Sequence, residues 1–297
     1  MELNREENVM LEGGVEKTSS PWRNIWSELV KNKAAMVGLS IIVILILIAL
    51  FGKYLMPYDP NTGVLAESLQ KPSSAHIFGT DEQGRDIFSR IIDGTKISLR
   101  VGITAVAIAL TAGIIFGSFA GYYGGKIDMY IMRLMDIILA FPSLLLAIAF
   151  MSALGKGIDK AIIAISIVTI PEYARIVRGS ILSVKENEYV QAAKAIGNND
   201  MGIIFKHILP NVMSPIIVRA TLGISTAILE TSALGFLGLG IQPPQAEWGS
   251  MLGAGRGYFY NAPHIVLFPG IAITITVLAF NLFGDGLRDA LDPKLRK

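Results

Sequence analysis

A carboxylate in the middle of an apolar stretch is the first feature of this sequence that could do chemistry. Glu230 lies within residues 208–240, which are otherwise strongly apolar apart from Arg219. Charged side chains are costly inside a membrane, so Glu230 is a candidate for a proton site or for the wall of a path taken by a polar solute. Arg219 is roughly 16 Å away along a helix, too far for direct pairing. We expect Arg219 to reach toward the membrane surface and leave open whether Glu230 lines a path or bonds to a neighbouring helix.

Three more charged residues stand at the ends of apolar stretches and are candidates for the same path. They are Asp136, Glu172 and Arg175. A structural role is equally open for each of them. Asp136 follows Arg133, and Arg175 follows Glu172, at the i,i+3 spacing that favours an ion pair on one helix.

The sequence contains no motif for a nucleotide-binding, metal-binding or catalytic site. The phosphate-binding pattern G-x-x-x-x-G-K-[ST] is absent, because Gly125-Lys126 has neither the earlier glycine nor the following hydroxyl residue. The sequence has no cysteine, three scattered histidines, and no Ser/His/Asp grouping or acid pair in a motif context. We therefore expect no enzyme activity, no cofactor, no metal and no nucleic-acid partner. Any energy for transport has to come from another subunit or from an ion gradient.

The elements that carry these residues are predicted to be membrane helices. The chain is 52% hydrophobic and 17% charged, with a mean hydropathy of +0.52, values typical of a multi-span membrane protein. About 20 apolar residues cross a bilayer. Uncharged stretches of that size cover 34–51, 101–123, 137–155 and 265–284, and two weaker ones cover 161–171, extended by 172–177, and 208–240. The sequence predicts an all-α polytopic protein with six transmembrane helices and both termini on one side.

The distribution of basic residues predicts which side that is. With the termini inside, the inward segments carry 14 Lys and Arg and the outward segments carry 8. The positive-inside rule then favours cytoplasmic termini. Residues 1–33 are predicted to be a cytoplasmic tail, in which Ser20 and Pro21 start a helix on the membrane surface with Trp22, Ile25, Trp26 and Leu29 on one face. Residues 34–56 form the first span and 57–96 an extracytoplasmic loop; the loop 240–264 faces the same way.

One inward segment, EYVQAAKAIGNNDMGIIFKHILPN at 188–211, is predicted to form a short helical hairpin. The first helix is expected from about 183 to 196. Gly197 suits the left-handed conformation that closes a helix. Asn199 or Asp200 caps a second helix, which Pro210 ends or bends.

This hairpin resembles the EAA loop of ABC importer permeases, which has Glu-Ala-Ala, then Gly, and ends in Leu-Pro. Here Gln191 replaces the glutamate before Ala192 and Ala193, and Leu209 precedes Pro210. Motifs spread over most of the chain, at 78–90, 121–148, 228–252 and 281–295, resemble the C-type permease of dipeptide, oligopeptide and nickel importers. The resemblance implies a type I ABC importer permease fold, with a permease core at 97–297 and a coupling hairpin at 183–210.

The resemblance also implies partners and a docking site. The partners are a homologous B-type permease, two ATP-binding subunits that hold ATP and Mg²⁺, and an extracytoplasmic substrate-binding protein, in the cytoplasmic membrane of a prokaryote. Contact with the ATPase is expected at Glu188, Tyr189, Gln191, Ala192, Ala193, Gly197, His207, Leu209 and Pro210. Because the glutamate of the pattern is missing, we expect Ala192, Ala193 and Gly197 to offer a surface defined by its shape.

The function expected from the resemblance is import of dipeptides or oligopeptides, with nickel or glutathione as alternatives. Two other classes remain open. One is an ion-coupled secondary transporter that uses Glu230 or Asp136, and the other is a membrane scaffold without transport activity. The hairpin and the missing phosphate-binding loop argue against both.

Overall fold

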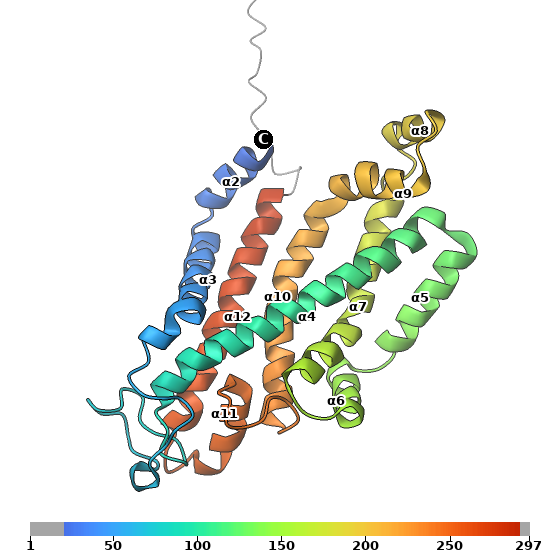
Figure 1. The fold of residues 1–297 in the computed structure, drawn as a ribbon. Helices are drawn as coiled ribbons and strands as arrows, with labels where there is room; N and C mark the ends of the chain where they lie inside the picture. Colours follow the sequence, from blue (N-terminus) through green and yellow to red (C-terminus); the bar gives the residue numbers. More distant parts are fainter. Residues whose placement is uncertain (1–20, 292–297) are drawn as a thin grey trace, which may run out of the picture.

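The computed structural model describes residues 21–291, and these residues form a bundle of helices (Figure 1). Its long helices are α2 (Pro21–Lys31), α3 (Lys33–Phe51), α4 (Ile87–Tyr123), α5 (Gly125–Leu139), α6 (Ser143–Leu154), α7 (Ile158–Leu182), α10 (Met213–Phe236) and α12 (His264–Leu291). Shorter elements are α8 (Glu188–Ala195), α9 (Asp200–Gly202), a π-helical turn η3 (Ile203–Ile208), the 3₁₀ turns η1 (Gly52–Tyr54), η2 (Leu65–Glu67), η4 (Leu209–Val212) and η5 (Arg256–Tyr258), and α11 (Trp248–Gly255).

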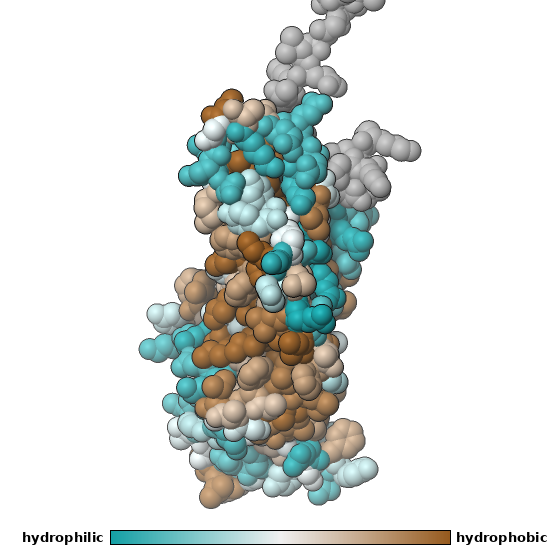
Figure 2. All heavy atoms as spheres, turned by 90° about the vertical axis from the view of Figure 1, so that its right-hand side faces the viewer, coloured by the Kyte–Doolittle hydropathy of each residue, from teal (hydrophilic) through white to brown (hydrophobic). Residues whose placement is uncertain are grey.

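Four helical segments of the described chain are long and apolar enough to cross a membrane. They are Lys33–Tyr54, Ile87–Tyr123, Asp200–Phe236 and His264–Leu291. The pair α5 and α6 makes a fifth if it is counted as one broken span. α7 has 25 residues but also carries five charged side chains. Figure 2 shows hydrophilic residues gathered at the end that carries α8 and hydrophobic residues over the helices below it.

The predicted span 137–155 falls on two helices that meet at a sharp break. α5 ends at Leu139, α6 starts at Ser143, and the two axes meet at 89°. Pro142 explains the break, because proline has no amide hydrogen and its ring disfavours helical geometry at the preceding residue.

The span predicted from residue 101 is part of a longer helix. α4 begins at Ile87, where the carboxylate of Asp86 accepts a hydrogen bond of 2.8 Å from the amide of Ser89. The helix therefore starts well before residue 97, the expected boundary of the core.

α4 and α7 cross at a stripe of glycines. Gly113, Gly117 and Gly121 follow one another at i,i+4 on α4, and all three are buried. A Cβ atom built on Gly113 would lie 2.3 Å from the Cβ of Tyr173 on α7. Small residues at this spacing allow two helix backbones to approach closely, so this stripe sets the contact between the two helices.

The N-terminal helix differs in detail from the predicted one. Ser20 lies outside the described residues, and the helix that starts at Pro21 stops at Lys31. Asn32 then caps α3 by accepting a hydrogen bond from the amide of Ala35. Leu29 is buried beside Ala290 of α12, and Trp26 is 54% exposed. α2 therefore packs partly on the bundle and presents only part of its apolar surface outward.

The bundle has two distinct ends. The hairpin end carries α2, the elements α8 to η4 and the C-terminal end of α12 (Figure 1). The opposite end carries residues 57–86 and α11.

Candidate functional site

The hairpin of residues 188–212 has an apolar core continuous with two long helices. Val190 of α8 and Ile203 and Ile208 of η3 are buried, and they pack in one cluster with side chains of α7 and the start of α10. The helix members of this cluster are Val177, Ile181 and Ile216. Because the core is shared, a force applied to the hairpin acts directly on α7 and α10.

The first helix of the hairpin is shorter than predicted. α7 runs to Leu182, a turn occupies 183–187, and α8 begins only at Glu188. Asn187 is extended, with φ −66° and ψ 150°, so the chain leaves helical geometry there. The predicted helix from 183 to 196 is therefore wrong at its start.

The turn between the two hairpin helices matches the prediction. Gly197 has φ +82°, the left-handed region that glycine adopts without steric cost. The side chain of Asn199 accepts a hydrogen bond of 2.7 Å from the amide of Gly202 and so caps α9. Pro210 lies in η4, where the hairpin turns into α10.

The tip of the hairpin, the turn that follows α8, exposes a large apolar side chain among polar residues. Ile196 is 80% exposed there, and Tyr189, Met201 and Phe205 are exposed on the elements that flank the turn. Ala192 is exposed as predicted, whereas Ala193 is 4% exposed and packs in the hairpin core. Ala193 thus holds α8 in place and presents no side chain to the surface, which corrects its predicted position.

The remaining residues predicted to contact an ATPase are spread from α8 to η4. Glu188, Gln191 and Pro210 are exposed, while His207 and Leu209 are half-buried. The side-chain amide of Gln191 donates a 3.2 Å hydrogen bond to Glu186. Sequence reasoning did not include Ile196, Met201 or Phe205 in the site, although large apolar side chains in a charged inward segment are themselves a signal of a contact surface.

Polar contacts tie the hairpin to α4 as well. The hydroxyl of Tyr122 donates a 2.9 Å hydrogen bond to Asp200 of α9. The ammonium group of Lys194 lies 5.5 Å from the centre of the Tyr122 ring, within range of a cation–π contact. The hairpin is consequently held by α4, α7 and α10 together.

The predicted i,i+3 ion pairs are wrong, because their members pair between helices. Arg175 of α7 contacts Asp136 of α5 at 2.9 Å. Glu172 of α7 pairs with Arg219 of α10, so Arg219 does not simply reach toward the membrane surface.

A third pair joins the same helices. Arg178 of α7 contacts Asp128 of α5 through two bonds of 2.5 and 2.6 Å. Three ion pairs therefore connect α7 to its neighbours on the hairpin side of the bundle.

Glu230 lies against α6. Its carboxylate lies near the side chain of Ser143, the first residue of that helix. The oxygen Oε2 is buried and has no hydrogen-bond partner within the described chain. Glu230 therefore lies beside a neighbouring helix, and both alternatives for its role stay predictions.

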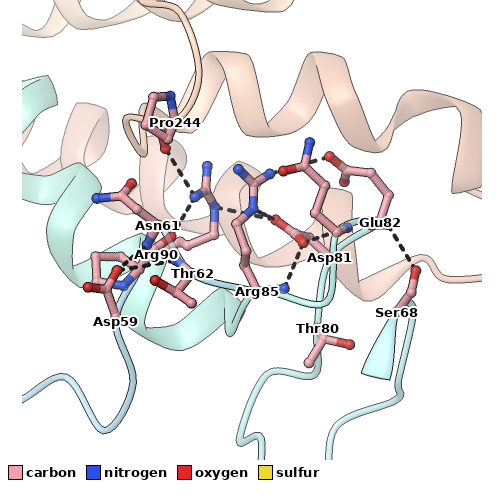
Figure 3. Close-up of polar contacts among 12 residues, drawn as sticks. Asp59, Asn61, Thr62, Ser68, Thr80, Asp81, Glu82, Arg85, Arg90 and Pro244 are labelled. Carbon is pink, nitrogen blue, oxygen red and sulfur yellow. Dashed lines mark hydrogen bonds and ion pairs between the residues drawn. The ribbon is translucent and has the colours of Figure 1, made fainter. Parts of the chain in front are cut away.

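The opposite end is held together by buried charges (Figure 3). Arg85 contacts Asp81 at 2.7 Å, and Arg90 lies 3.5 Å from the same carboxylate. The guanidinium of Arg90 also donates to the carbonyls of Pro60 and Pro244, at 2.6 and 3.3 Å. Arg90 thus joins the segment 57–86 to the loop that follows α10.

A buried glutamate fixes α11 at this end. Glu247 is fully buried, and its carboxylate accepts hydrogen bonds of 2.8 and 2.7 Å from the amides of Gly249 and Ser250. Burial raises the pKa of Glu247 to about 7, although these two hydrogen bonds act in the other direction. Glu247 therefore caps α11 and contacts no solvent.

Comparison with protein families identifies two regions of the chain. A family described as "Binding-protein-dependent transport system inner membrane component" matches residues 113–297. A second, described as "N-terminal TM domain of oligopeptide transport permease C", matches residues 20–72.

Relatives of known function match over almost their full length. A dipeptide transport system permease protein of Alkalihalophilus pseudofirmus is 54% identical over 93% of this chain and 91% of its own length. A glutathione transport system permease protein of Pectobacterium atrosepticum is 46% identical over 93% and 92%. A di/tripeptide transport system permease protein of Pseudomonas aeruginosa is 45% identical over 93% of both chains.

Solved structures share the fold at low identity. A chain of an inward-facing methionine ABC transporter matches with a TM-score of 0.57 and 18% identity, covering 69% of this chain and 98% of that one. A chain of an amino acid ABC transporter matches with a TM-score of 0.54 and 15% identity, covering 68% and 94%.

Proposed function

Because the chain belongs to the family of inner-membrane components of binding-protein-dependent transport systems, we propose that it forms half of the translocation path of an ATP-driven peptide importer. The family consists of multi-pass transport subunits and not of enzymes. ATP hydrolysis is assigned to partner subunits that bind ATP and Mg²⁺.

The proposed topology has six spans and cytoplasmic termini. It counts the broken pair α5 and α6 as one span and α7 as another, in addition to the four apolar spans. The hairpin lies at the same end of the bundle as α2 and the C-terminal end of α12, which supports a common side for all three (Figure 1). The excess of basic residues in these segments supports the cytoplasmic side.

The partners proposed for this chain are a homologous second permease, two ATP-binding subunits and an extracytoplasmic substrate-binding protein. The hairpin of residues 188–212 is the proposed contact with one ATP-binding subunit. The observation that carries this proposal is the shared apolar core, in which Val190 and Ile203 pack with Val177 and Ile216. Movement of the ATPase would act through that core on α7 and α10 and change the packing of the bundle between two states.

The proposed substrates are short peptides. The relatives named above transport dipeptides, tripeptides or glutathione, which share a peptide bond and terminal carboxylates. The sites proposed for the path are Glu230, Asp136, Glu172 and Arg175, because their charged groups lie within or between the long helices.

A substitution at Gly197 tests the coupling role. Gly197→Val places a β-branched residue at φ +82° on the hairpin surface, where a Cβ meets no atom within 4 Å in this chain. Gly155→Val is the matched control, since Gly155 has φ +88° and equally open surroundings but joins α6 to α7. Both variants carry similar backbone strain, and only the first alters the proposed docking surface.

The measurement is ATP hydrolysis and peptide uptake by the assembled complex in proteoliposomes. We expect Gly197→Val to lose the co-purified ATPase or to hydrolyse ATP without uptake, with normal membrane insertion. Gly155→Val should keep uptake coupled to hydrolysis. Normal uptake and normal ATPase stimulation in the Gly197→Val complex would show that the hairpin does not couple the two.

A further inference from the structure

Two grooves open on α10 and α12. The first, of about 410 Å³, lies between α7, the start of α10 and the end of α12. Its walls are apolar except for Ser214, Arg219 and Arg288. The second, of about 390 Å³, lies between α6, α10, α11 and α12, and its walls are apolar except for Ser232. Both volumes are within the range of small-molecule sites in proteins.

The two grooves lie on one face of α10. Pro215, Arg219 and Leu222 line the first groove, and Leu229, Ala233 and Phe236 line the second. These positions follow one another at spacings of three, four or seven residues, which places them on one side of a helix. Leu222 and Leu229 are about 10 Å apart along the axis. The grooves therefore follow one another along this face of α10, from the hairpin end toward the opposite end.

The first groove contains a guanidinium group that has no counter-ion among residues 21–291. Arg219 is paired with Glu172, so its charge is compensated. Arg288 makes no ion pair or hydrogen bond with any described residue, and it is exposed in the groove. Asp285 and Asp289 are on the same helix but do not line the groove. A free guanidinium beside apolar walls suits a carboxylate attached to an apolar group, because arginine holds a carboxylate with two parallel hydrogen bonds.

We infer that this face of α10 and α12 is a wall of the translocation path and that Arg288 binds the terminal carboxylate of a peptide in the first groove. The inference rests on the proposed function as a peptide importer. Arg219, paired with Glu172, supplies the hydrogen-bonding rim beside it. The second groove, with Leu229, Phe236 and Ile273, is a separate apolar site farther along α10. An anionic phospholipid offers similar charge chemistry, and the experiment separates it from a peptide.

The absence of cysteine from the chain permits a direct test. Leu222→Cys places a thiol in the first groove, and Ala233→Cys, similarly half-buried, places one in the second. The assembled complex is treated with an anionic and with a neutral thiol-specific reagent, and the rates are corrected for the complex with the cysteine-free chain. Leu291→Cys, on the other wall of the first groove, repeats the comparison if the first variant does not assemble.

We expect the anionic reagent to be favoured at Leu222→Cys by about fivefold relative to Ala233→Cys, the effect of one partly screened charge at short range. Adding Arg288→Gln should remove this preference. A dipeptide with a free carboxylate should slow labelling at Leu222→Cys, and the same dipeptide with a C-terminal amide should not.

Three results would overturn the inference. They are equal preference for the anionic reagent in both grooves, a preference that survives Arg288→Gln, and labelling that phosphatidylglycerol slows but the dipeptide does not. Uptake of the same dipeptide by the cysteine-free complex is measured in parallel. Normal uptake without protection refutes only the carboxylate site, whereas absent uptake refutes the proposed function itself.

Discussion

Replacing Ile196 by alanine should weaken the binding of the ATP-binding subunit without destabilising this chain. Ile196 is 80% exposed at the hairpin tip. Burying an isoleucine side chain completely is worth about 1.5–3 kcal/mol, so a partner that covers the exposed four-fifths gains roughly 1.2–2.4 kcal/mol. At 1.4 kcal/mol per factor of ten, the variant should bind the ATPase about 7-fold to 50-fold more weakly.

The assay is titration of the purified ATP-binding subunit against the permease pair in detergent or nanodiscs. Leu65→Ala is the matched control, because Leu65 is 77% exposed but lies in the segment 57–86 at the opposite end. We expect Leu65→Ala to bind the ATPase as the unmodified chain does. Equal affinities for the Ile196→Ala complex and the unmodified complex would refute the idea that the hairpin tip enters the ATPase.

Two further predictions concern stability. Gly113→Ala should lower the melting temperature in detergent, because its Cβ would meet Tyr173 at 2.3 Å and overpacking costs about 1–3 kcal/mol. The control is Gly179→Ala, whose Cβ meets nothing within 4 Å and which should leave the melting temperature unchanged or raise it slightly. An equal loss of melting temperature in both variants would contradict the close crossing of α4 and α7. With its pKa raised from 4.5 to about 7, folded Glu247 binds a proton more tightly than the unfolded chain does, so stability should fall as pH rises through that window. Glu247→Gln should flatten this part of the curve of melting temperature against pH. An unchanged slope would show that Glu247 is not the group responsible for the pH dependence.

Local features of the fold could be predicted from the sequence because their causes are local. Gly197 closes α8 through its own backbone freedom, and Asn199 caps α9 through a side chain three residues from its partner. The break at Pro142 follows from the missing amide hydrogen, although its angle depends on what α5 and α6 pack against. The apolar spans could also be predicted locally, because the length and hydrophobicity of each span depend only on its own residues.

Contacts between distant segments could not be predicted in this way. Asp136 and Arg133 have a spacing that favours pairing, but Asp136 bonds to Arg175, which only the packing of α5 on α7 brings near. Ala193 is small enough for a contact surface, but whether it faces a partner or the hairpin core depends on how α8 is placed. The turn at 183–187 starts α8 later than predicted, and Ala193 is buried in the core. Arg90, which pairs with Asp81, also reaches the carbonyl of Pro244 because the loop after α10 folds back onto α4.

The glycine stripe on α4 consists of Gly113, Gly117 and Gly121, whose i,i+4 spacing does not specify which helix they contact. Repeated small residues indicate a close helix contact without naming the second helix. The structure supplies α7 as that helix.

The most direct measurement of the central claim is a cross-link from the hairpin tip to the ATPase. In the assembled complex, Ile196→Cys carrying a short photoactivatable group should cross-link to the ATP-binding subunit, and Leu65→Cys carrying the same group should not. The account predicts that the yield at position 196 changes when ATP is bound, because the hairpin moves with its partner. A complex that transports peptide while position 196 gives no cross-link to the ATPase would contradict the account.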